Sequence, residues 1–141
     1  MREDIKKKLL AAKAAAADEA RAALQEKEAG ILTKETLEQH VLAYILAKFH
    51  LSREEIRSTD LNDLAEQSLA KTMKIDIALV EGADKSPSCD GASSVEMKQA
   101  LLIMALQKDL HVKLDGIKAA FADTAEELSA LIWEQFSGEI L

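Results

Sequence analysis

The longest apolar pattern in the second half of the chain reads Ser93-Ser94-Val95-Glu96-Met97-Lys98-Gln99-Ala100-Leu101-Leu102-Ile103-Met104-Ala105-Leu106. Its apolar side chains recur at the spacing of a broad helix face, which predicts a helix from Ser94 to Leu110. Ser93 and Glu96 have the Ser-x-x-Glu spacing of a capping box. The pattern therefore predicts Ser93 as the N-cap and Ser94 as the first helical residue.

The serine pair follows the clearest loop of the chain, Gly82 to Ala92, which holds the only proline and two glycines. Loops of this kind carry function more often than packed elements do. Backbone N–H groups at a helix N-terminus are free and partly positive, so they suit an attached phosphate. Because a cap hydroxyl is occupied by a backbone N–H, we expect Ser94 to be the exposed hydroxyl and Ser93 to be second choice.

The rest of the chain also predicts helices, because it has one proline, five glycines and almost no alternating β-branched residues. Thr33 can cap a helix to about His50. Ser52 and Glu55 form another capping box, and Asp60 can cap a helix over residues 61–75. Asp123 or Thr124 can cap the last helix. The predicted core residues of these helices are Leu37, Val41, Leu42, Ile45, Leu46, Phe49, Leu61, Leu64, Leu69, Met73, Met97, Leu101, Leu102, Met104, Ala105, Leu106, Leu128, Leu131, Ile132 and Phe136.

Three segments resemble the acyl carrier protein family. They read Gly91-Ala92-Ser93-Ser94-Val95, Met104-Ala105-Leu106-Gln107-Lys108-Asp109-Leu110-His111-Val112-Lys113-Leu114, and Phe121-Ala122-Asp123-Thr124-Ala125-Glu126-Glu127-Leu128 with Ile132. The likeness runs from about Cys89 to Trp133. It implies an all-α, four-helix acyl-carrier-like bundle with an inserted helix and a long N-terminal helix.

The resemblance also implies a covalent 4′-phosphopantetheine at Ser94. In the family an aspartate precedes the modified serine, whereas Ser93 stands there in this chain, and Asp90 is the alternative acid. The segment from Ser94 to Met104 is about two residues longer than the common pattern. Ser93 remains the second candidate for attachment.

The first part of the chain leaves two questions open. Residues 1–29 hold seven basic and six acidic side chains and few apolar ones, which predicts a long, largely solvated helix. This helix can serve packing or dimerisation, or it can be a docking element for one partner. We divide the chain into an N-terminal helical extension of residues 1–30 and an acyl-carrier-like helical domain of residues 31–141. The helix over 61–75 is either an insertion or the first core helix in place of 34–50.

Composition limits the function classes. The chain of 141 residues has 18 basic and 25 acidic residues, a net charge of −7. It shows no basic patch interleaved with aromatic residues, so we expect no nucleic-acid partner. It also has no signal-peptide pattern or apolar span, so a cytoplasmic protein is expected. The single cysteine, Cys89, cannot form an internal disulfide, and the three histidines lack zinc-site spacing.

These patterns predict a carrier without catalytic activity of its own. The phosphopantetheine thiol at Ser94 would hold an acyl or aminoacyl group as a thioester. A phosphopantetheinyl transferase and acyl-processing enzymes would be its partners, as in fatty-acid or polyketide biosynthesis. Lys98 and Lys108 make the helix after Ser94 less acidic than is usual in the family, which favours a dedicated pathway. The alternative is an unmodified acyl-carrier-like helical module that binds another protein.

Overall fold

The structure is a computed structural model that describes residues 2–79 and 91–140. Within these ranges the side chains of residues 2–5, 8, 9, 72–79, 91–94 and 138–140 are not described. The helices are α1 (Arg2–Ala29), α2 (Lys34–Phe49), α3 (Leu61–Leu79), α4 (Gly91–Leu110), α5 (Gly116–Ala120) and α6 (Ala125–Ile140). The described ranges contain no β-strand, so the prediction of an all-α bundle is confirmed.

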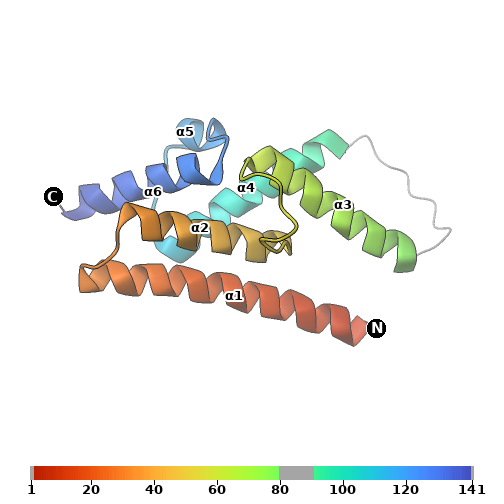
Figure 1. Cartoon of the computed structure of the whole chain (residues 1–141). Helices are drawn as coiled ribbons and strands as arrows, with labels where there is room; N and C mark the ends of the chain where they lie inside the picture. Colours follow the sequence, from red (N-terminus) through yellow and green to blue (C-terminus); the bar gives the residue numbers. More distant parts are fainter. Residues whose placement is uncertain (1, 80–90, 141) are drawn as a thin grey trace.

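Helices α1 and α2 form an antiparallel hairpin along one side of the molecule (Figure 1). Gly30 ends α1 with φ +75°, a left-handed backbone conformation that glycine adopts without steric cost. Thr33 then caps α2, because its hydroxyl accepts a 3.1 Å hydrogen bond from the Thr36 N–H. The predicted cap at Thr33 is therefore confirmed.

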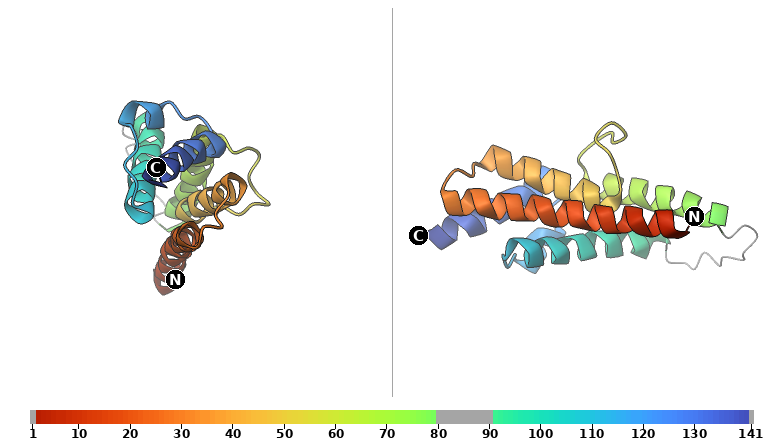
Figure 2. Two further views of the ribbon diagram at one scale, coloured as in Figure 1. Left: turned by 90° about the vertical axis from the view of Figure 1, so that its left-hand side faces the viewer. Right: turned by 90° about the horizontal axis from the view of Figure 1, so that it is seen from below.

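The remaining helices complete a single bundle. Helix α2 lies between α1 and α6, while α4 packs against α1 and α3, as the end-on view of Figure 2 shows. Most of the core residues predicted on α2, α3, α4 and α6 are buried. They are Leu37, Val41, Ile45, Leu46, Phe49, Leu61, Leu64, Leu102, Leu106, Leu128, Ile132 and Phe136.

The starts of α3 and α6 are joined by hydrogen bonds between the two preceding loops. The Leu61 N–H donates to the Asp123 carbonyl at 2.7 Å, and the Ala125 N–H donates to the Thr59 carbonyl at 2.9 Å. The carboxylate of Asp60 accepts from the Asp63 N–H, which confirms Asp60 as the cap of α3. Thr124 accepts from the Glu127 N–H in the same way, so Thr124 is the cap of α6. Side-chain caps thus fix where both helices begin.

The prediction that residues 1–29 form a largely solvated arm is wrong for the second half of α1. Ala16, Ala20 and Ala23 are at most 4% exposed and belong to the same core cluster as α2 and α4. Small alanine side chains let the helix backbones approach closely, so a helix with few large apolar residues still packs. The boundary at residue 30 stays a prediction.

Helix α3 belongs to the core, because Leu61, Leu64 and Ala65 are at most 1% exposed. Residues of α2 are buried in the same core cluster, so both helices contribute to one core. The side chain of Met73 lies outside the described residues. So does most of the predicted loop from Gly82 to Ala92, although Gly91 and Ala92 form the start of α4.

Candidate functional site

The two candidate serines lie in the first turn of α4. The helix begins at Gly91, three residues before the predicted first helical residue Ser94. The prediction that Ser93 is the N-cap is therefore wrong, because Gly91 and Ala92 already have helical backbone. The side chains of both serines lie outside the described residues. Attachment at Ser94 stays a prediction.

The helix that follows has two different apolar faces. Leu102, Leu106 and Leu110 are at most 3% exposed and face the core. On another side Met97, Leu101 and Met104, spaced by four and three residues, are 59%, 55% and 63% exposed. The prediction that Met97, Leu101 and Met104 lie in the core is wrong, because the packing of α4 on α1 and α3 leaves this side uncovered. We call Met97, Leu101 and Met104 the apolar stripe of α4.

A groove lies beside this stripe, between α4 and the short helix α5. It has a volume of about 530 Å³, and its lining includes Glu96, Gln99, Ile103 and Met104 from α4 and Gly116 and Ala120 from α5. Ile117 and Phe121, in and just after α5, are 71% and 77% exposed. The part of α4 that follows its first turn thus borders a groove with both polar and apolar groups.

The loop between α4 and α5 is fixed by specific bonds. Gln107 accepts a 2.8 Å hydrogen bond from the Leu114 N–H. Asp115 caps α5 by accepting from the Ile117 and Lys118 N–H groups. Leu110, Val112 and Leu114 are buried, as the alternation in this segment predicts. These contacts place α5 at the edge of the groove.

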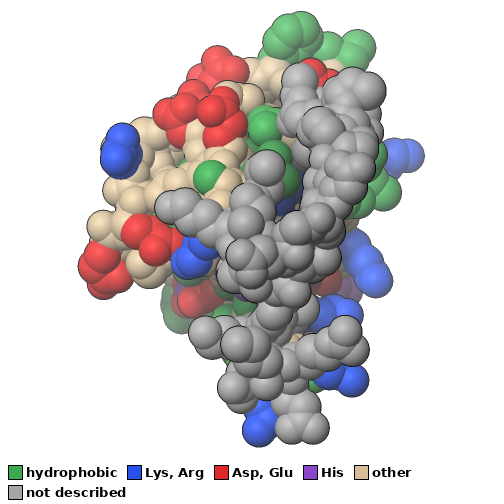
Figure 3. Space-filling model, turned by 90° about the vertical axis from the view of Figure 1, so that its right-hand side faces the viewer, with side chains coloured by type: hydrophobic (Ala, Val, Ile, Leu, Met, Phe, Trp, Pro, Cys, Tyr) green, Lys and Arg blue, Asp and Glu red, His purple; other side chains and the backbone are tan. Residues whose placement is uncertain are grey.

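The buried side of α4 near its start carries positive charge. Lys98 Nζ lies 5.4 Å from the centroid of the Phe49 ring, and burial lowers the pKa of this lysine. Burial and then the charges of Lys98 and Lys71 lower the pKa of His50. Lys71 is balanced by Glu55, whose carboxylate lies 2.8 Å from its Nζ. On the face in Figure 3, most of the described acidic side chains lie toward the upper left and most of the described basic side chains lie toward the lower right.

One polar cluster was not predicted from the sequence. His40 on α2 lies between Glu19 and Glu26 of α1, within hydrogen-bonding distance of both. The two glutamates are seven residues apart, so they share a helix face, but only the pairing of α1 with α2 brings His40 between them. No group of three or more His, Cys, Asp and Glu side chains in the described parts of the chain could hold a metal ion.

Comparison of the chain with protein-family models, curated proteins and solved structures found no match. None of the helices in the described ranges is both long and apolar enough to span a membrane.

Proposed function

We propose that the chain is a carrier protein that holds an acyl or aminoacyl group as a thioester on a 4′-phosphopantetheine arm at Ser94. The observation that carries this proposal is the position of Ser94 in the first turn of α4, on the same helix as the apolar stripe and the groove beside α5. The three-segment resemblance to acyl carrier proteins supplies the chemistry.

Attachment would be a phosphoryl transfer from coenzyme A, catalysed by a separate transferase. The Ser94 oxygen would form a bond to the phosphorus that bears the pantetheine group. The bond from that phosphorus to the second phosphate would break, and 3′,5′-bisphosphoadenosine would leave while the serine proton passes to a base of the transferase. The serine needs only accessibility, because the transferase supplies the catalytic groups.

The surface next to Ser94 suits such an arm and its partners. A helix rises about 1.5 Å per residue, so Ser94 and Met104 are separated by about 15 Å along α4. The groove along this length combines glutamine amides with apolar side chains, which matches an arm of amide and methylene groups. The apolar stripe would contact the partner enzymes, since exposed apolar residues on one helix face are typical of binding surfaces.

The alternative is an unmodified helical module that binds a protein through the same surface. The specific observation in its favour is Ser93, which replaces the acid that precedes the modified serine in carriers. In that case the apolar stripe would be a binding surface and Ser94 an ordinary helix residue.

The deciding experiment is the intact mass of the chain after incubation with coenzyme A, magnesium and a broad-specificity phosphopantetheinyl transferase. A reductant must be present, because Cys89 can form a mixed disulfide with coenzyme A. We expect the wild-type chain to gain one phosphopantetheine and Ser94→Ala to gain none. An unchanged wild-type mass, with a known carrier modified in the same reaction, favours the unmodified module.

A further inference from the structure

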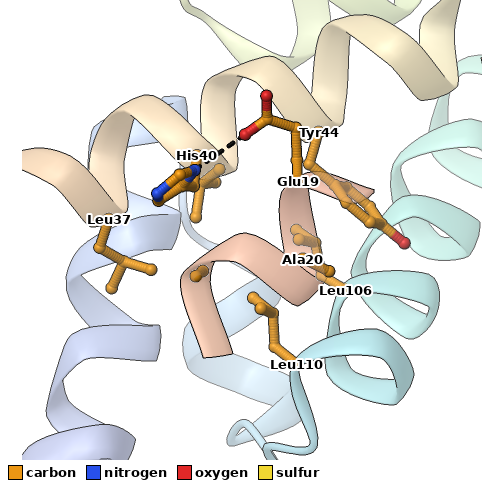
Figure 4. A pocket seen from close by; sticks show the side chains of 9 residues that line it. Glu19, Ala20, Leu37, His40, Tyr44, Leu106 and Leu110 are labelled. Atoms are coloured by element: carbon orange, nitrogen blue, oxygen red, sulfur yellow. Dashed lines mark hydrogen bonds and ion pairs between the residues drawn. The ribbon is translucent and has the colours of Figure 1, made fainter. Parts of the chain in front are cut away.

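The contact between α1 and α2 contains a histidine held from both sides. Nδ1 of His40 lies 2.8 Å from a carboxylate oxygen of Glu19, and Nε2 lies 2.9 Å from a carboxylate oxygen of Glu26. Figure 4 shows His40 and Glu19 meeting between α2 and α1. The His40 side chain is only 18% exposed, so the cluster is partly shielded from water.

This geometry favours a charged ring. A neutral imidazole has one N–H donor and one acceptor nitrogen, whereas an imidazolium donates from both nitrogens. Both partners here are carboxylates, which accept when ionised. Burial by itself lowers the pKa of His40, but hydrogen bonds to Glu19 and Glu26 and their negative charges together outweigh burial and hold the pKa above 6.5.

On the α1 side, the described apolar residues at this contact are mostly small. Among the described side chains of α1, Ala16, Ala20 and Ala23 are buried, and the larger Leu24 is partly buried. The opposing face carries larger side chains from α2 and α4. Those that surround the cluster are Leu37, Val41, Tyr44, Leu106 and Leu110. Each alanine buries little area, so the polar link adds to the packing that holds this part of α1 in place.

We propose that His40 clamps α1 onto α2 only while its ring is protonated, so that rising pH loosens α1 from the face formed by α2 and α4. The charged groups around the ring are Glu19 and Glu26 from α1. Tyr44 lines the same crevice from α2, and its hydroxyl is bonded to Asp109 of α4. Loss of the ring proton leaves one donor for two carboxylates, so one carboxylate loses its partner.

The direction of the effect follows from linkage. Because the pKa of His40 is higher in the folded chain than 6.5, its contribution is fully present below pH 6.5 and is lost as pH rises through the folded-state value. Opening of α1 would expose Leu37, Val41 and Leu106, which are otherwise buried. Release of the clamp would thus make an apolar face of the bundle accessible at alkaline pH.

The test is an NMR titration of the full chain from pH 5.5 to 9. The ring resonances of His40 report its protonation, and hydrogen exchange of the α1 amides, corrected for the intrinsic pH dependence of exchange, reports opening. We expect protection of residues 16–23 to fall roughly tenfold as His40 titrates, because a charge-assisted hydrogen bond is lost. Protection of α6 should stay constant over the same range.

Two variants separate this mechanism from general destabilisation. Glu26→Gln keeps an acceptor but removes one charge, so the His40 titration and the α1 transition should move together to lower pH. His111→Asn is the matched control, since His111 is exposed, has φ +57° and lies outside the clamp, and asparagine tolerates this backbone conformation. The proposal is overturned if α1 protection does not follow the His40 titration in the wild-type chain. It is equally overturned if His40 titrates at or below pH 6.5.

Discussion

The hydroxyl of Tyr44 on α2 donates a 2.6 Å hydrogen bond to a carboxylate oxygen of Asp109 on α4. Tyr44 is 1% exposed, and Lys48 Nζ lies 5.7 Å from the centroid of its ring. Burial and the bond to the Asp109 carboxylate raise the pKa of the Tyr44 phenol, so it remains a donor throughout the physiological range. Tyr44 and Asp109 are 65 residues apart in the chain, and their bond connects α2 to α4.

Removal of this hydroxyl should destabilise the bundle. We expect Tyr44→Phe to lower the free energy of unfolding by about 1–2 kcal/mol, because the ring packing stays while the bond to a charged acceptor is lost. Urea denaturation followed by circular dichroism measures the change. Asp109→Asn keeps an acceptor for the Tyr44 hydroxyl, so it should lower the free energy of unfolding by less than Tyr44→Phe does. If Tyr44→Phe unfolds at the same urea concentration as the wild type, the bond has no stabilising role.

The packing of α1 can be tested with two neighbouring alanines. Ala16 is 0% exposed, whereas Ala15 is exposed on the same helix. We expect Ala16→Met to cost about 1–3 kcal/mol, since a larger side chain must displace packed neighbours. Ala15→Met should change the free energy of unfolding by less than about 0.5 kcal/mol. If both variants change the free energy of unfolding equally in urea titrations, α1 does not pack against the bundle through the face that holds Ala16.

Leu101 and Leu102 test the assignment of the two faces of α4. They are adjacent in the chain but 55% and 3% exposed. We expect Leu102→Ala to cost about 2–5 kcal/mol through lost burial and a cavity, and Leu101→Ala to stay within about 0.5 kcal/mol of the wild type. Thermal and urea unfolding of both variants measures this. Greater destabilisation by Leu101→Ala would place the apolar stripe inside the core.

The sequence predicted the helices well because their signals are local. Thr33, Asp60 and Thr124 each satisfy a backbone N–H near the start of their own helix, so their role can be read from a few neighbouring residues. The core faces of α2 and α6 followed from helical periodicity for the same reason.

The errors about the exposed side of α4 and the packing of α1 have a common physical origin in tertiary packing. Whether Met97 and Met104 are buried depends on which side of α4 meets α1 and α3, and periodicity alone does not say this. The packing of α1 through its alanines was not predicted, because small residues contribute little to the hydrophobic periodicity of a sequence. The bonds of His40 to Glu19 and Glu26 required the pairing of two helices to be known.

The start of α4 at Gly91 changes what is expected of Ser93. As the third residue of the helix instead of its cap, Ser93 should contribute little to stability. We expect Ser93→Ala to change the free energy of unfolding by less than about 0.5 kcal/mol, against about 1 kcal/mol for a lost cap. Urea denaturation measures the difference, and Thr124→Ala is the matched control in which a true cap is removed. A loss of about 1 kcal/mol in Ser93→Ala would contradict the observed helix start.

Attachment at Ser94 is tested most sharply by locating the modification within the tryptic peptide from Ser86 to Lys98. This peptide contains Ser86, Ser88, Ser93 and Ser94, so fragmentation of the modified peptide distinguishes all four hydroxyls. After reaction with coenzyme A and the transferase, we expect one phosphopantetheine on Ser94, both in the wild-type chain and in Ser93→Ala. A phosphopantetheine on Ser93, or an unmodified peptide from a folded chain, would contradict attachment at Ser94.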